Sequence, residues 1–307
     1  MTYLKLNKIM DTNIERLLKI GLYAMSKSSE EERWFPGHIG ASLITIALFI
    51  EENSLNSEVE KVIISKADEI IDLNLIRYLD ISSDIKQSIK PIEDAIAVNV
   101  ENFSADGHGI IYGSLALKAI DILDINISSD IIQGINKLIL LAQNDNVGRY
   151  WTVENYKTLN IEHSQLNHFK DVYEAADYCL NHQENVLNNE VINDKTYYFS
   201  GSRLHEVTHS NALMLLDKLG YSNLAKTGLR GLEKQIYFNK KQPTELRPEK
   251  NHQVFNPLEV EFWKYPIKDY HHYKLAYAVF NLFNILKVKN TDQILKAISS
   301  HWKIINV

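Results

Sequence analysis

Apolar residues at three- and four-residue spacing run through most of the chain, and little interrupts them. Only 12 glycines and 6 prolines occur in 307 residues, so few positions break a helix. Strand-like composition is confined to the short run at 196–199. We therefore predict an all-α fold in a single domain over residues 1–307, made of stacked antiparallel helical hairpins around a buried, histidine-lined site.

Capping and breaking residues divide the periodic stretches into predicted helices. Pro36 and Gly37 separate the first two predicted helices, which form a hairpin, and Gly220 ends a later helix. The segment 144–170 has no clear period, and the proline-containing segment 240–266 is predicted to be a loop that covers a pocket. The predicted helices are 13–26, 38–51, 57–79, a stretch from Pro91, 110–123, 129–143, 203–219, 222–238, 270–286 and 292–302.

The composition excludes several kinds of partner and site. A net charge of −6 and a pI near 6.0, without an arginine-rich stripe, argue against nucleic-acid binding. The single cysteine, Cys179, excludes a disulfide framework, a thiolate zinc site and an iron–sulfur cluster built by one chain. No signal-peptide core or membrane-length apolar run is visible, so we expect a soluble, cytoplasmic protein without a membrane partner. Any metal must therefore be held by nitrogen and oxygen.

Four of the eleven histidines share a context that the others lack. His38, His108, His205 and His271 each stand where an apolar helical stretch begins. In packed hairpins the ends of several inner helices converge, so these four side chains can meet although they are far apart in sequence. Imidazole is the commonest protein ligand for first-row metals. Lys274 lies three residues after His271, on the same face of the predicted helix.

These stretches, in this order, resemble the questin-oxidase-like family. The matches are short, but together they span residues 37 to 275. They are Gly37-His38-Ile39-Gly40-Ala41, Asp106-Gly107-His108-Gly109-Ile110-Ile111, His205-Glu206-Val207-Thr208 with Ala212-Leu213, and His271-His272-Tyr273-Lys274-Leu275. The resemblance implies an α-helical oxidoreductase of secondary metabolism that uses dioxygen on a small aromatic or polycyclic phenolic substrate. It also implies oxidative cleavage of a ring carbon–carbon bond or a Baeyer–Villiger-type outcome.

The resemblance further implies a non-haem Fe(II) ion held by His38, His108, His205, His271 and a carboxylated Lys274. Zinc is the alternative metal. A lysine buried beside a dication loses its proton readily, and the neutral amine can capture carbon dioxide to give an anionic oxygen ligand. His272 competes with His271 for the fourth ligand position, and the spacing to Lys274 favours His271. The sequence leaves the oligomeric state open.

A rival motif overlaps the third stretch. His205-Glu206-Val207-Thr208-His209 fits H-E-x-x-H, which places two zinc ligands on one helical face with Glu206 as the base of a metallohydrolase or protease. Glu233 is a conceivable third ligand. Under the iron hypothesis, His209 and the pocket-lining Tyr112 are instead candidates for contact with the substrate, so the catalytic candidates are His209, Tyr112 and Glu206. A third hypothesis is a non-catalytic helical scaffold, which predicts no bound metal.

Overall fold

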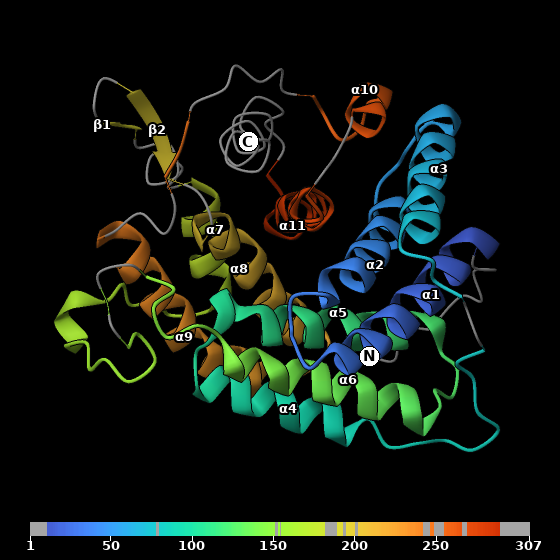
Figure 1. The fold of residues 1–307 in the computed structure, drawn as a ribbon, viewed down its shortest axis with the longest axis horizontal. Helices are drawn as coiled ribbons and strands as arrows, with labels where there is room; N and C mark the ends of the chain where they lie inside the picture. Colours follow the sequence, from blue (N-terminus) through green and yellow to red (C-terminus); the bar gives the residue numbers. More distant parts are fainter. Residues whose placement is uncertain are drawn as a thin grey trace.

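The computed structural model describes most of the chain. The described residues are 11–77, 80–150, 153, 155–181, 189–192, 195–199, 202–241, 246–248, 255–265 and 269–288. Helices dominate these residues and pack into one domain, which confirms the predicted all-α class and the single helical domain (Figure 1).

The observed helices follow the predicted order closely. They are α1 (Thr12–Ser28), α2 (Gly37–Glu52), α3 (Ser57–Leu73), α4 (Lys90–Glu101), α5 (His108–Leu123), α6 (Ser129–Leu141), α7 (Val172–Asn181), α8 (Ser202–Lys218), α9 (Ser222–Lys241), α10 (Val260–Lys264) and α11 (His271–Leu286). A small antiparallel sheet of β1 (Asn189–Ile192), β2 (Lys195–Phe199) and β3 (Leu246–Pro248) pairs in that order. Its middle strand contains the run at 196–199 that has strand-like composition.

Several of the predictions differ from the structure. Helix α3 ends at Leu73 rather than at 79, because Asn74 leaves the helical conformation and Leu75 takes a left-handed one with φ +50°. Helix α7 was not predicted, and α10 lies inside the segment 240–266 that was predicted to be a loop. The predicted helix 292–302 lies outside the described residues, as do parts of the segment 240–266.

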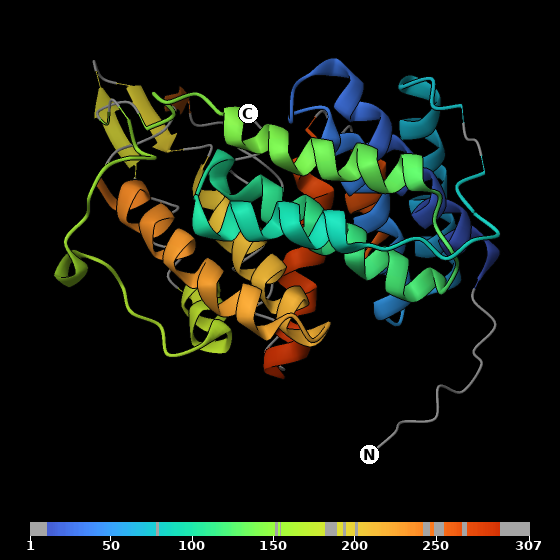
Figure 2. The same ribbon diagram turned by 90° about the horizontal axis from the view of Figure 1, so that it is seen from below.

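Four inner helices form the centre of the domain. Helix α2 packs against α5 and α11, and α8 also packs against α5 and α11, so the four close a ring of contacts. Helices α2, α5 and α11 are buried on almost every side, as their nearly continuous apolar sequences require. The outer helices complete the core, with α1 on α2, α9 and α7 on α8, and α4 beside α6 along one side (Figures 1 and 2).

None of the helices in the described ranges has the length and apolar character needed to cross a membrane.

Candidate metal centre

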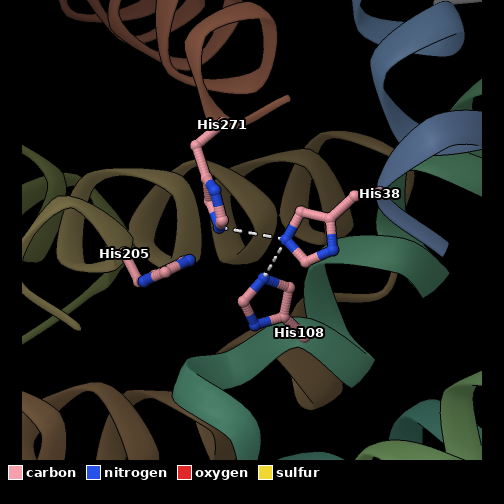
Figure 3. A group of neighbouring side chains, drawn as sticks. All are labelled: His38, His108, His205 and His271. Atoms are coloured by element: carbon pink, nitrogen blue, oxygen red, sulfur yellow. Dashed lines mark hydrogen bonds between the residues drawn. The ribbon is translucent and has the colours of Figure 1, made fainter. Parts of the chain in front are cut away.

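Each of the four inner helices contributes one histidine to a common point. His38, His108, His205 and His271 each offer one ring nitrogen, and these atoms all lie within 4.8 Å of one another. The Nε2 atom of His38 is 3.0 Å from Nε2 of His271 and 3.0 Å from Nε2 of His108 (Figure 3). All four side chains are buried. The structure thus brings together the four histidines that the sequence singled out.

The position of each histidine in its helix explains the convergence. His108 and His271 are the first residues of α5 and α11, His38 is the second of α2, and His205 lies in the first turn of α8. Side chains of a helix lean toward its N-terminus. The rings therefore project beyond the helix starts into the space where the four helices meet.

The outer ring nitrogens face oxygen atoms. Nδ1 of His38 is 2.6 Å from the Phe35 carbonyl oxygen, and Nδ1 of His108 is 2.6 Å from the Ala105 carbonyl oxygen. Nδ1 of His271 is 2.6 Å from Oδ1 of Asp269. Such acceptors keep the proton on Nδ1 and leave the Nε2 lone pair directed inward, as in histidines that bind metals. The fourth ring, that of His205, also points its distal nitrogen at the other three (Figure 3).

Burial keeps three of the four histidines neutral. The pKa values of His38, His108 and His271 are lowered well below 6.5, first by burial and then by the nearby Lys274 amine. A neutral imidazole is the form that binds a metal ion. At neutral pH the cluster is therefore ready to receive a cation without first losing protons from these rings.

Lys274 completes the group. Its side chain is buried, and its Nζ lies 3.3 Å from Nε2 of His108 and 5.9 Å from the centre of the Tyr112 ring. Burial lowers the pKa of Lys274 from 10.5 to about 7, although Asp269 opposes this shift. A large fraction of the amine is thus neutral at physiological pH, and a neutral amine can act as a nucleophile or a ligand.

The lowered pKa of Lys274 predicts a pH-dependent stability of the metal-free protein. Between about 7 and 10.5 the unfolded lysine binds a proton that the folded one does not, so stability rises with pH across this window. Urea unfolding at pH 7 and pH 9 is expected to show a gain about 2 kcal/mol larger for the natural protein than for Lys274→Met. Equal gains in the two proteins would mean that the lysine keeps its ordinary pKa.

Aromatic side chains surround the imidazoles. The ring of Trp34 lies 4.6 Å from that of His108, and the ring of Phe35 lies 4.5 Å from that of His38. The hydroxyl of Tyr112 is 2.7 Å from Nδ1 of His38. Phe35 is 58% exposed although it touches a buried histidine, so it marks a side on which the centre lies close to the surface.

The other residues of the rival motif do not join this group. Nδ1 of His209 is 3.0 Å from Oε1 of Gln235, and burial lowers the pKa of His209 to about 4. The Glu206 carboxylate accepts a hydrogen bond of 2.8 Å from Nδ2 of Asn239. Within the described ranges, no group of three or more potential ligands includes His209, Glu206 or Glu233. His205 therefore shares the centre with three distant histidines and not with His209.

Comparison with known proteins assigns no family. No protein-family model matches the chain, and no curated protein or solved structure is similar to it. The resemblance to the questin-oxidase-like family is carried by the short motifs alone. The function must therefore be argued from the geometry of the centre.

The donor set fits a metal ion. Two imidazole nitrogens at right angles around an ion, with bonds of about 2.1 Å, lie about 3.0 Å apart. The two Nε2 pairs around His38 have this separation. The group contains no thiolate and no carboxylate, so nitrogen atoms supply all of its donors. The buried four-histidine group can hold a metal ion.

Sequence reasoning missed three charged residues that support the histidines. Asp269 faces His271, Asp106 lies behind His205, and Arg149 joins Asp106 from a turn after α6. Asp106 and Asp269 each lie two residues before a candidate histidine ligand in the sequence. A carboxylate so close to a ligand could have been predicted to accept a hydrogen bond from a ligand imidazole. Nothing in the asparagine-rich sequence around Arg149 indicates its role.

Proposed function

We propose that this protein is a non-haem iron oxygenase that acts on an aromatic or polycyclic phenolic compound. The observation that carries the proposal is the group of four buried imidazoles with Lys274 beside it. The oxygen partners of Nδ1 on His38, His108 and His271 favour the tautomer that has no proton on Nε2. In that tautomer the Nε2 pairs 3.0 Å apart have no proton to share, so their lone pairs repel one another. A cation at the centre removes that cost.

Iron is favoured over zinc by the angle between donors. Tetrahedral zinc places its ligand nitrogens about 3.4 Å apart, whereas right-angled coordination places neighbours about 3.0 Å apart. The two 3.0 Å separations around His38 are close to the second geometry, which belongs to ions that take five or six ligands, whereas the four nitrogens together spread over as much as 4.8 Å and would have to draw closer around an ion. Four histidines and one further donor then leave a position for dioxygen or a substrate oxygen.

Lys274 is proposed to supply the further donor. Its neutral amine can add to carbon dioxide, forming a C–N bond and releasing one proton, to give a carbamate with a negative charge. The carbamate would offset part of the charge of a dication, as a carboxylate does in other iron sites. Uptake of labelled bicarbonate into the protein loaded with diamagnetic zinc, detected by carbon NMR, is expected for the natural protein and not for Lys274→Met.

When bound, iron would supply the redox chemistry that activates dioxygen. The chain's own residues bind and orient the substrate. The exposed face of Phe35 offers a stacking surface for a planar ring within reach of His38 and His271, whose ring centres lie 4.5 and 6.5 Å away. Trp34 packs against His108, with its ring centre 4.6 Å from that of the imidazole. Cleavage of a ring carbon–carbon bond or a Baeyer–Villiger-type insertion is the proposed outcome.

The direct test is oxygen consumption by the iron-loaded protein. Phenolic polycycles are added one at a time, and both oxygen uptake and the mass of the product are measured. Substrate-dependent uptake with a product that gains oxygen supports the proposal. A panel that is turned over only by hydrolysis, without oxygen uptake, would contradict it.

Glu206→Gln separates the oxygenase from a zinc hydrolase. In a hydrolase of the H-E-x-x-H type this change removes the base that activates water, and activity falls by about 100-fold or more. In the proposed oxygenase, the Glu206 carboxylate contacts Asn239 outside the centre, so metal content and oxygen uptake should stay within about twofold of the natural protein. The assay is metal analysis together with oxygen uptake.

A further inference from the structure

The segment before α5 has an unusual backbone. Ala105, Asp106 and Gly107 all have positive φ angles, of +47°, +52° and +81°. A left-handed conformation costs about 1 kcal/mol or more at each residue other than glycine. Local strain of this kind persists only where surrounding contacts hold it in place. The contacts of Asp106 are therefore informative.

The Asp106 carboxylate is fully buried and held from several sides. Its Oδ1 accepts a hydrogen bond of 2.7 Å from the hydroxyl of Tyr150, and its Oδ2 accepts one of 2.8 Å from Nη1 of Arg149. The same Oδ2 atom lies 3.8 Å from Nδ1 of His205. Tyr150 and Arg149 thus fix the carboxylate with one oxygen facing the imidazole.

This placement completes a pattern. His38, His108 and His271 each have Nδ1 within 2.6 Å of an oxygen, from Phe35, Ala105 and Asp269. On the side of His205, the Asp106 carboxylate lies 3.8 Å from Nδ1, and a movement of roughly 1 Å would bring the pair to hydrogen-bond distance and make Asp106 the corresponding acceptor. Ala105 and Asp106 are adjacent, so one strained segment supports both His108 and His205.

Charge favours the same assignment. The N-terminal ends of four helices, each carrying partial positive charge, converge on the centre. A metal dication there needs nearby negative charge. The carboxylates that face its proposed ligands are those of Asp106 and Asp269, each beside the start of a ligand helix.

We infer that Asp106 is a positioning residue of the metal centre, holding the His205 ring with its proton on Nδ1 and its Nε2 atom toward the other histidines. The inference rests on the proposed metal site and adds a residue to it. Asp106 does not touch the metal in this arrangement. It raises the basicity of His205 and fixes the orientation of its ring.

Asp145 provides a matched control. Like Asp106, it is a buried carboxylate that binds Arg149, in this case through both oxygens, and it accepts a hydrogen bond of 2.8 Å from a tyrosine, Tyr156. Unlike Asp106, it forms no ion pair with a histidine among the residues that the structure describes. Asp106→Asn and Asp145→Asn therefore remove the same kind of charge from the same arginine, and only the first acts on His205.

The experiment measures cobalt(II) binding by competition with a chelator, together with the visible absorption spectrum of bound cobalt. Asp106→Asn is expected to weaken binding by about 10- to 100-fold and to shift the spectrum. Asp145→Asn should stay within about threefold of the natural protein, with an unchanged spectrum, although both variants lose thermal stability.

Unchanged affinity and spectrum in Asp106→Asn would overturn the inference, and so would an equal loss in both variants. If Asp106→Asn does not fold, Tyr150→Phe loosens the same carboxylate and should weaken binding several-fold; an unchanged affinity there also overturns it. Failure of the natural protein to bind cobalt or iron would instead overturn the proposed function itself. The two failures are therefore distinguishable.

Discussion

Replacing His205 by alanine is expected to leave the protein folded but unable to retain a metal ion. The change removes one of four nitrogens that face the centre, and the remaining three are fixed on separate helices that cannot rearrange to replace it. Affinity should fall by more than about 100-fold, which exceeds the cost of losing an outer hydrogen bond. Metal titration with thermal unfolding as a check on folding measures this loss.

His209→Ala is the matched control, because His209 is equally buried on the same helix one turn later and lies outside the group. It should keep its metal. The neighbouring pair His271 and His272 gives a second comparison: His271→Ala should lose the metal and His272→Ala should retain it, since only His271 joins the group. Metal loss in both members of either pair would contradict the assignment.

Replacing Gly40 by alanine is expected to lower the free energy of unfolding by about 2 kcal/mol. A Cβ at Gly40 would lie 2.5 Å from the carbonyl oxygen of Gly21 and 2.5 Å from the backbone nitrogen of Met25. Helices α1 and α2 touch there through their backbones, so one must move away from the other. Overpacking of this kind costs about 1–3 kcal/mol or more, which exceeds the gain of about 1 kcal/mol in helix propensity.

Gly231→Ala separates the packing cost from helix propensity. Gly231 also lies inside a helix, α9, but a Cβ there would make ordinary contacts of 3.4 Å with Phe103. Urea unfolding should therefore show an unchanged or slightly higher stability for Gly231→Ala. Equal losses of stability in the two variants would mean that the close approach of α1 and α2 is not the reason why alanine destabilises position 40. Because Gly40 follows His38 by two residues, Gly40→Ala should also weaken metal binding.

The helices were predictable where the apolar period is continuous and bounded. Helix α2 begins at Gly37 directly after Pro36, and α11 begins at His271 at the head of an apolar run. The histidines lie at these same helix starts, so the sequence indicated both the inner helices and their candidate metal ligands. A short helix such as α7 has too few turns for its period to stand out.

The surroundings of the centre were not predictable. The positions of Asp106 and Arg149 depend on three successive left-handed residues and on a turn after α6, which no periodicity encodes. The H-E-x-x-H match at His205 and His209 also misleads, because Gln235 from α9 meets the second ring. Tertiary packing rather than local spacing decides which histidines share a site.

Elemental analysis of the protein, purified without added metal and without a histidine tag, shows whether the four histidines hold iron. About one iron per chain is expected, lost in His205→Ala and kept in His209→Ala. Zinc in place of iron would contradict the oxygenase and favour a hydrolase. Absence of any metal from the natural protein, even after anaerobic addition of Fe(II), would contradict the metal centre itself.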